Sequence, residues 1–477
     1  MIPVLLILTP LITGLAAFLM KQSATVKGWA VLSSLVSLAI AIAGVFFYPS
    51  HQLVFDAAWL PDLGSRFAMQ MDGMGKMLCL LTAVSFPIIF IATYKNEYKN
   101  PGSFYALMLL TQAGLTGVFV ATDALLFYFF WELALVPMYF LCSTWGGEKR
   151  IPVTFKFFVY TFLGSLLMLI GILYVYFHTP DRSFAMQSFY HTVMDSGMEK
   201  FAFWLFFIAF AIKMPVFPFH TWQPDAYEQS PTAATMVLSG VMVKMGLFAA
   251  IRWLLPVFPH ASQHFADVVI ILSVIGILYA SLIAIRQDDF KRMIAYSSIA
   301  HIGLMSAAIF AGKPAGWNGV MVQMFNHGIN VIGLWIVADV VEQQLGTRKL
   351  SEMGGLARKA PVLAILLVVL AFANVALPLT NAFVGEFLMF NGLFQYNMWM
   401  AAAACISVIL AAVYTLNMVQ KILYGNTGAI TENAREISPN VQWMLVVIVI
   451  GILILGVYPQ PMINLTRDSV QALLAHR

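Results

Sequence analysis

The sequence predicts an all-α integral membrane protein, a single transmembrane domain over residues 1–477 with about fourteen spanning helices. The first observation is composition: 61% of the residues are hydrophobic and only 10% are charged, whereas about a quarter of the residues in a soluble protein are charged. The second is that the apolar runs reach about 20 residues, the length that crosses a bilayer. The third is that these runs are continuous rather than alternating, which excludes strands as the spanning elements.

The apolar runs follow one another along the whole chain. The first run ends in a basic residue, Lys21, whereas a signal peptide begins with basic residues, so we expect it to be the first spanning helix. A shorter apolar piece, 383–397, is assigned to the twelfth helix. The expected helices cover residues 2–21, 27–47, 74–94, 104–121, 123–144, 153–178, 199–217, 232–254, 264–285, 291–311, 316–344, 361–377, 400–424 and 440–459.

The loop cations predict an orientation. If the N-terminus lies outside, the inner loops hold fifteen Lys and Arg residues and the outer loops hold eight. This is the asymmetry that the positive-inside rule requires. Because the expected number of helices is even, both termini are expected on the outer (periplasmic) side of an inner, cytoplasmic membrane.

Several classes of protein are excluded by what the sequence lacks. The net charge of +4 comes from scattered loop cations, so no nucleic-acid surface is expected. Cys79, Cys142 and Cys405 lie far apart in apolar runs, which is typical of packing residues and not of an iron–sulfur or zinc site. The sequence contains no GxGxxG loop and no phosphate-binding loop. We therefore expect no cofactor and no metal in this chain.

Two segments interrupt the helical pattern at membrane depth. Residues 211–234 contain four prolines, and residues 373–387 contain Pro378. Proline removes a backbone donor and interrupts a helix, and a broken helix survives in a bilayer only where protein or a wet cavity satisfies the freed groups. Paired breaks of this kind often mark a transport path between two repeats. Simple packing kinks are the alternative, since the two halves show no clear residue-by-residue similarity.

Four charged side chains lie inside otherwise apolar helices: Glu132, Lys213, Lys244 and Glu386. A charge near the bilayer centre costs several kcal/mol, so each must be paired, neutralised or hydrated. Lys156 is different, because it lies one turn from a helix end and can reach the interface. Two acids and two bases at this depth indicate a pathway, with two inert ion pairs as the alternative.

Protons are the species that such side chains can carry. Lysine and carboxylate groups both exchange protons, and moving a Glu away from a Lys favours release of the lysine proton. Na⁺ fits less well, because it requires several oxygen ligands and a lysine repels it. His301 and His327 also lie in expected helices, close to Ser297, Ser298, Asn326 and Asn330. We expect these histidines to relay protons, although each could equally be a hydrogen-bonded core residue.

Four long stretches of the sequence resemble the antiporter-like membrane subunits of respiratory complex I. They are FFWELALVPMYFLCSTWGGEKR, AIKMPVFPFHTWQPDAYEQSPTAATMVLSGVMVKMG, DDFKRMIAYSSIAHIGLM and AFVGEFLMF. The resemblance covers nearly the whole chain. It implies fourteen helices with two inverted five-helix repeats, each with one broken helix, which here would span residues 104–254 and 264–424.

The resemblance also implies a subunit type and a set of site residues. The acidic residue of the twelfth helix, Glu386, is similar to that of the M-type chain, the counterpart of mitochondrial subunit 4, where other types usually have Lys. The resemblance carries proton translocation over to Glu132, Lys213, Lys244, Glu386, His301 and His327. Ala376, Leu379 and Ala382 stand where relatives frequently have glycine, and Tyr227 stands where they frequently have His.

The expected function is proton translocation as a subunit of an NADH–quinone oxidoreductase. The resemblance implies that NADH, FMN, iron–sulfur clusters and quinone bind to partner subunits, among them two further antiporter-like chains beside this one. Three alternatives stay open: a subunit of a multisubunit cation/proton antiporter, a subunit of a membrane-bound hydrogenase-type complex, and a structural anchor with inert charged pairs.

Overall fold

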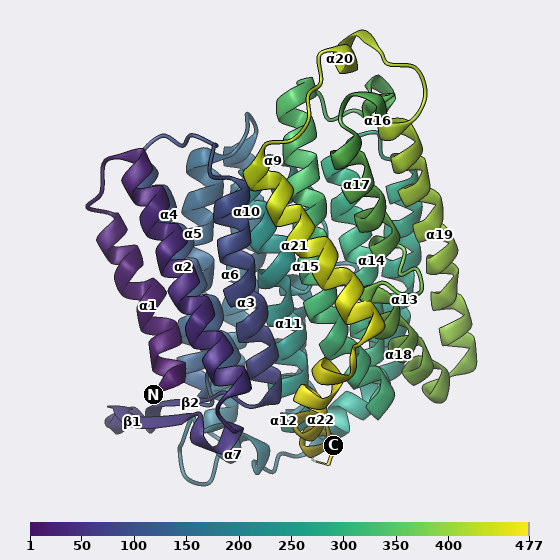
Figure 1. The fold of residues 1–477 in the computed structure, drawn as a ribbon. Coiled ribbons are helices and arrows are strands. Elements are labelled where there is room, and N and C mark those ends of the chain that lie inside the picture. Colours follow the sequence, from purple (N-terminus) through teal and green to yellow (C-terminus); the bar gives the residue numbers. More distant parts are fainter. Residues whose placement is uncertain (476–477) are drawn as a thin grey trace.

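The computed structural model describes residues 1–475 and consists mainly of long helices that run between two ends of the molecule (Figure 1). Within the described residues, eleven helices are long and apolar enough to cross a membrane. Each of the fourteen ranges expected from the sequence overlaps a helix of the structure. Both termini lie at the same end of the bundle (Figure 1), as the even helix number predicts.

The first part of the chain forms six long helices that begin and end close to the expected residues. Asp72 and Asp123 cap the third and the fifth by accepting hydrogen bonds from backbone N–H groups of the first turn, as helix N-termini require. The helices are α1 (Ile2–Ala17), α2 (Ser23–Phe46), α3 (Gly73–Ala92), α4 (Pro101–Val120), α5 (Ala124–Trp145) and α6 (Arg150–Tyr176).

A β-hairpin between α2 and α3 was not expected from the sequence. Strands β1 (Val54–Leu60) and β2 (Ser65–Gln70) pair antiparallel, with Val54 opposite Gln70. The hairpin lies at the end of the molecule that holds both termini (Figure 1). The sequence signal is weak because this segment lies between two strong apolar runs and is itself only half-buried.

The first break lies where the prolines predict it. Helix α8 (Ser196–Lys213) ends four residues before the expected boundary, and the short helix α9 (Gln223–Gln229) follows a nine-residue irregular stretch, 214–222. The chain then forms one span, Thr232–Val257, in which α-helical turns alternate with two π-helical segments. Its parts are α10 (Thr232–Val237), η3 (Leu238–Met242), α11 (Val243–Ala249), η4 (Ala250–Leu254) and α12 (Leu255–Val257), and the short α7 (Met186–Tyr190) precedes α8.

The second half contains the other break. Helix α17 (Pro361–Asn374) stops before Pro378, and α18 (Asn381–Tyr396) restarts after it. The apolar piece assigned to the twelfth helix is therefore a separate helical segment that follows the interruption. The remaining elements before α19 are α13 (Pro259–Arg286), α14 (Phe290–Ala311), α15 (Pro314–Leu345) and α16 (Leu356–Lys359).

The C-terminal part adds one element that the sequence analysis missed. Helices α19 (Met398–Leu423) and α21 (Pro439–Val457) are the last expected spans, with the short α20 (Ala429–Glu432) between them. The additional helix, α22 (Gln460–Leu474), is amphipathic and packs against α3 and α15.

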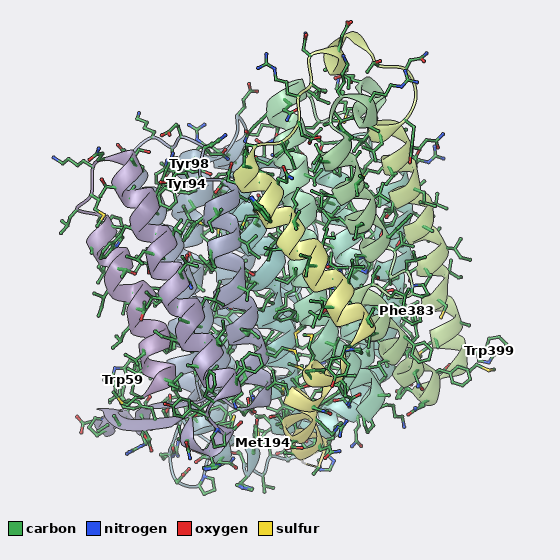
Figure 2. All side chains as sticks on the ribbon, viewed as in Figure 1. Trp59, Tyr94, Tyr98, Met194, Phe383 and Trp399 are labelled. Atoms are coloured by element: carbon green, nitrogen blue, oxygen red, sulfur yellow. The ribbon has the colours of Figure 1, made fainter. Side chains whose placement is uncertain are left out.

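Burial distinguishes the centre of the bundle from its periphery. The apolar windows of Thr232–Val257 and of α15 are buried along their whole length, whereas α19 and α21 expose most of theirs. Aromatic side chains mark both ends of the spans, with Tyr94 and Tyr98 near one end and Trp59 and Trp399 near the other (Figure 2). Such belts are typical of residues at the two membrane–water interfaces.

Candidate functional site

Four of the six predicted site residues come together at the centre of the bundle. Lys244 lies on α11, His327 on α15, His301 on α14 and Glu386 on α18. All four side chains are buried, and none is more than 8% exposed. They come from both halves of the chain, so only the folded bundle brings them together.

Lys244 is the most deeply buried of the four. Its Nζ lies 2.7 Å from the carbonyl oxygen of Ser239 and 2.9 Å from Nδ1 of His327. Ser239 belongs to the π-helical segment η3, five residues before Lys244. Local π-helical turns shift backbone groups out of the regular helical ladder and are frequent at functional sites. Here the helix supplies a backbone acceptor for a lysine that has no carboxylate within ion-pair distance in the described chain.

The two histidines connect Lys244 to Glu386. The rings of His327 and His301 lie 5.5 Å apart, centre to centre. Nδ1 of His301 lies 2.9 Å from Oε1 of Glu386, while its Nε2 has no protein partner. The two imidazole rings are therefore neighbours, tilted by 56° to each other, without a direct hydrogen bond between them in the structure. Lys244, His327, His301 and Glu386 thus form one file of titratable groups, which we call the central axis.

The second break is held beside the central axis by an amide cluster. The side-chain amides of Asn330 and Asn381 exchange two hydrogen bonds of 2.9 and 3.0 Å, and Asn326 Nδ2 donates to the backbone oxygen of Asn381. Gln323 Nε2 lies 3.4 Å from Oε1 of Glu386. Gln323, Asn326 and Asn330 share α15 with His327, so one helix contacts the start of α18, the histidine and the glutamate.

The other two predicted residues, Glu132 and Lys213, lie apart from the central axis. Lys213 is the last residue of α8, and its Nζ lies 5.5 Å above the ring of Trp131. Glu132 on α5 interacts electrostatically with Lys213, but among the described residues the two form no ion pair within 4 Å. Oε1 of Glu132 and Nζ of Lys213 each lack a hydrogen-bond partner in the protein. The expected pair is therefore linked by a charge interaction and not by direct contact.

The two lysines are linked through packing. A Cβ atom placed on Gly246 would lie 2.8 Å from the backbone nitrogen of Met214. The turn after Lys244 therefore packs directly on the end of α8, which is where Lys213 lies. Glycine is required at this contact because any side chain would push the two helices apart.

Several polar residues of the site were not predicted from the sequence. Asn381, Gln323 and Ser239 contact predicted residues, and Ser297 bonds to Tyr414 on α19. A usable signal existed for Gln323, which lies one helical turn before His327 and so shares its face. No such signal existed for Tyr414, because its partner lies 117 residues away along the chain. The predicted Ser298 has no protein partner for its hydroxyl.

Comparison with known proteins decides the family. Residues 121–411 match the family described as NADH:quinone oxidoreductase/Mrp antiporter, TM. The chain belongs to this family. The matched range includes all six predicted site residues, the six helices that carry them and both breaks.

Named relatives within the NADH:quinone oxidoreductase/Mrp antiporter family are similar over most of their length. The chain is 37% identical to NADH-quinone oxidoreductase subunit M of Rhodobacter capsulatus over 458 residues, which cover 93% of this chain and 88% of the relative. It is 36% identical to subunit M of Escherichia coli (strain K12) over 433 residues, 88% of this chain and 85% of the relative. It is 36% identical to subunit M of Rickettsia prowazekii over 428 residues, 89% and 87% of the two chains.

Solved structures of the family share the fold. A chain of respiratory complex I from Thermus thermophilus superposes with a TM-score of 0.92 at 28% identity, over 99% of this chain and 100% of that one. A chain of the Mrp complex from Dietzia superposes with a TM-score of 0.89 at 19% identity, over 99% and 97% of the two chains. At that identity the second match shows the fold alone.

Proposed function

We propose that this chain is the M-type proton-translocating membrane subunit of an NADH–quinone oxidoreductase and that protons cross it along the central axis. The observation that carries the proposal is the file from Lys244 to Glu386, two close polar pairs whose imidazole rings lie 5.5 Å apart, buried in a bundle with few other charges. Each of these four titratable groups costs free energy to bury. A purely structural membrane anchor would gain nothing that offsets this cost.

The geometry gives each residue a step. A protonated Lys244 donates a hydrogen bond to Nδ1 of a neutral His327, which fixes the remaining ring proton on Nε2. Transfer of the lysine proton leaves a neutral amine and an imidazolium. The imidazolium then loses its other ring proton toward His301, and His301 passes one to Glu386. Each transfer moves one proton and leaves its donor neutral. The last transfer converts the carboxylate of Glu386, the final acceptor, to a carboxylic acid.

In this proposal Glu132 and Lys213 form a separate pair that supplies protons to the central axis. The Glu132 charge favours the protonated form of Lys213, and moving the carboxylate away favours release. The close packing at Gly246 places the end of α8 against the helix of Lys244. We infer that Lys213 hands its proton toward Lys244 through water, since neither group has a direct link to the other.

The remaining parts of the reaction belong to partner subunits in this proposal. Within residues 1–475, no group of three or more His, Cys, Asp and Glu side chains is placed to hold a metal ion. NADH oxidation and quinone reduction take place in other chains of the complex and drive the protonation changes here. The chain lies in the inner membrane with both termini outside, as the distribution of the loop cations favours.

Single substitutions test the proposal in the assembled complex. We expect Lys244→Ala and Glu132→Ala, made separately, to abolish or strongly reduce proton pumping into proteoliposomes during NADH oxidation. Lys21→Ala is the control, because Lys21 is exposed at the end of the first helix. Normal pumping by either the Lys244 or the Glu132 variant would contradict the proposal.

The alternative complexes predict different partners. An antiporter would show Na⁺-dependent proton flux without NADH, and a hydrogenase-type complex would contain no NADH-oxidising subunit. Mass spectrometry of the purified complex separates the three cases. The presence of NADH-oxidising and quinone-site subunits supports the proposal, and hydrogenase or antiporter partners would overturn it.

A further inference from the structure

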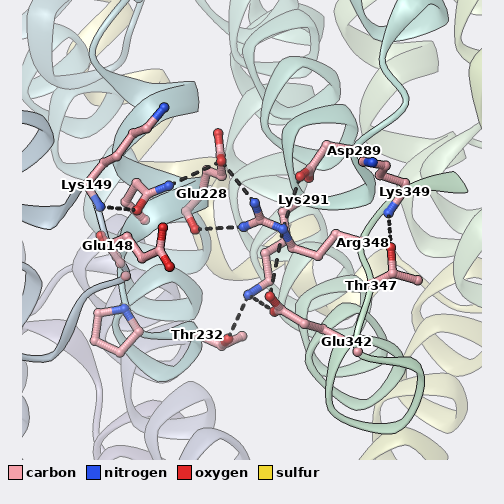
Figure 3. Close-up of a pocket in the computed structure, with 15 residues that line it drawn as sticks. Glu148, Lys149, Glu228, Thr232, Asp289, Lys291, Glu342, Thr347, Arg348 and Lys349 are labelled. Carbon is pink, nitrogen blue, oxygen red and sulfur yellow. Dashed lines mark hydrogen bonds and ion pairs between the residues drawn. The ribbon is translucent and has the colours of Figure 1, made fainter.

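One buried lysine of the described chain lacks the kind of partner that the other buried lysines have. The buried lysines are Lys27, Lys76, Lys213, Lys244 and Lys291. Four of them donate a hydrogen bond to an oxygen atom. Lys291, for example, bonds to Glu342 and to Thr232 in a charged cavity (Figure 3). Nζ of Lys213 has no hydrogen-bond partner within residues 1–475, although the side chain is only 2% exposed.

The backbone at the end of α8 does not supply the missing partner. A lysine in the last turn of a helix often bonds to the carbonyl groups that are left unpaired there. In α8 the carbonyl oxygens of residues 210–212 already accept hydrogen bonds, two from backbone N–H groups that follow the helix and one from the indole N–H of Trp222. The helix end therefore gives Lys213 a favourable dipole but no hydrogen bond.

The indole ring of Trp131 lies beside the Lys213 ammonium instead. Nζ of Lys213 lies over the face of this ring, 5.5 Å from its centre. A cation within about 6 Å of an aromatic face is attracted by the negative charge of that face, most strongly for tryptophan, and the attraction grows where water is excluded. Trp131 is 1% exposed. The contact is therefore of the kind that stabilises an ammonium group away from water.

Aromatic neighbours fix the orientation of this ring. The ring of Phe127, one turn earlier on α5, lies 5.6 Å from that of Trp131, centre to centre, and the ring of Phe210 lies 5.8 Å from it. Phe210 is on α8, three residues before Lys213. One helix supplies the indole, and the other supplies both the lysine and part of the support of the indole. The contact therefore depends on how α5 and α8 lie relative to each other.

Trp131 is the sequence neighbour of Glu132, and the two residues offer Lys213 different surroundings. Successive residues of an α-helix point about 100° apart, so the two side chains leave α5 in different directions. Glu132 is half-buried, whereas Trp131 is buried. An ammonium group that leaves the carboxylate can thus stay charged at the ring without returning to bulk water. In the structure the ammonium lies at the ring and not in direct contact with Glu132.

We propose that Trp131 is a positioning residue for proton transfer and that its indole face holds the Lys213 ammonium while this lysine is separated from Glu132. The proposal rests on the proposed function, in which separation of the pair favours release of the lysine proton. The ring stabilises the separated state. Because a ring attracts a cation less strongly than a carboxylate does, the proton is released more readily from this position.

The test changes the charge on the ring face and keeps the shape of the ring. We expect fluorinated tryptophan analogues at position 131 to lower the rate of proton pumping during NADH oxidation stepwise with each added fluorine, because fluorine withdraws the electron density that attracts the ammonium. Trp131→Leu removes the whole attraction and should lower the rate about tenfold, with Trp131→Phe in between. The measurements use the assembled complex in proteoliposomes.

Trp253 provides the matched control. It is also 1% exposed, and its ring also packs against Phe127, at 5.3 Å between centres. Among the described residues no cation lies over the ring of Trp253. We expect Trp253→Leu to cost about as much stability as Trp131→Leu, because both remove a large buried side chain. Fluorination at Trp253 should leave the pumping rate unchanged.

Two results would overturn the proposal. One is a pumping rate that stays constant along the fluorinated series at position 131, and the other is an equal loss along the same series at Trp253. The fluorinated series keeps this decision available where Trp131→Leu does not assemble. Glu132→Ala separates this failure from failure of the proposed function: loss of pumping there, with full pumping along the fluorinated series, overturns the role of Trp131 alone.

Discussion

Two residues of the second break adopt a backbone conformation that favours glycine. Ala376 has φ +58° and Leu379 has φ +75°, both in the left-handed region. For an L-residue with a side chain this conformation costs about 1–2 kcal/mol. They are two of the three positions where the resemblance implied a frequent glycine, the residue that adopts this conformation without steric cost. The break in this chain is therefore held against a local backbone preference.

Replacing one of these two residues with glycine should stabilise the protein. We expect Leu379→Gly to raise the stability by about 1 kcal/mol, because glycine adopts positive φ without steric cost. Leu379 is 67% exposed, so little packing is lost. The measurement is the thermal unfolding temperature of the purified complex in detergent. The matched control is Leu377→Gly, in the same loop but outside the left-handed region, where we expect a loss of stability.

Glu228 on α9 gives a prediction for pH. It accepts hydrogen bonds from Arg292 at 2.8 Å and from Arg348 at 3.0 Å. Burial raises the pKa of Glu228, but the hydrogen bond from Arg292 and the charges of both arginines outweigh that effect and hold the pKa below its usual value. A lowered pKa contributes stability that is present above the unfolded-state pKa, about 4.3, and is lost as the pH falls through the folded-state value.

We therefore expect Glu228→Gln to lower stability at pH 7 by about 2 kcal/mol, since two arginines lose their shared carboxylate. The difference in the free energy of unfolding between the variant and the unchanged protein should become smaller as the pH falls from about 5 to 3. Unfolding temperatures across that range provide the measurement. A gap that stays constant over the whole range would show that Glu228 does not titrate in this way.

Individual charges were predictable because they are rare. Glu132, Lys213, Lys244 and Glu386 stand out against apolar neighbours, and the cost of burying a charge marks them as special. Their partners were not predictable. The link between Lys244 and His327 joins residues 83 apart in the chain, and only the folded bundle makes them neighbours. For the same reason the gap between Glu132 and Lys213 could not be read from one sequence.

Among the helices, the breaks were predictable and the π-helical segments were not. Proline has no backbone donor, so its position predicts where a helix stops. The segments η3 and η4 contain no proline or other residue that signals them. Both lie in a wholly buried span, and we did not expect them from the apolar run alone. The hairpin and α22 were missed because the analysis followed long apolar runs.

The contact between α8 and α11 supports a prediction at the level of helices. In Gly246→Ala the new methyl group would lie 2.8 Å from the Met214 nitrogen and 2.9 Å from the Phe210 oxygen. Both are backbone atoms and cannot rotate away, so we expect a loss of about 1–3 kcal/mol. Gly451→Ala on α21 is the control. It has no neighbour within 4 Å, and we expect no loss because alanine favours a helix. Equal unfolding temperatures for the two variants would contradict this account.

At the scale of the whole molecule, arginines of the second half hold acidic residues of the first. Arg292 on α14 bonds to Asp225 and Glu228, and Arg348 after α15 also bonds to Glu228. Asp225 bonds in addition to Lys156, which ties α6 to α9. The helix ranges and the common end of the termini followed from hydropathy and charge. This clamp between the halves did not, since it needs their relative placement.

The orientation itself has a direct test. We expect a cysteine at Asp62, at the tip of the hairpin, to react with a membrane-impermeant maleimide in intact cells. A cysteine at Asn433, in the loop before α21, should react only after the membrane is opened. Both positions are exposed, and Cys405→Ala removes the exposed native cysteine. The reverse pattern would place both termini inside.

Helix α15 has a mechanical consequence. It is 32 residues long, or about 48 Å at 1.5 Å per residue, and it carries His327 near its middle and Glu342 near one end. The two residues are fifteen positions apart, or about 22 Å along the axis. A helix that is buried over most of its length moves as a stiff rod. Any force that pulls Glu342 away from Lys291 therefore also shifts the imidazole four turns away, so one sliding motion would move the Lys291–Glu342 ion pair and the central axis together.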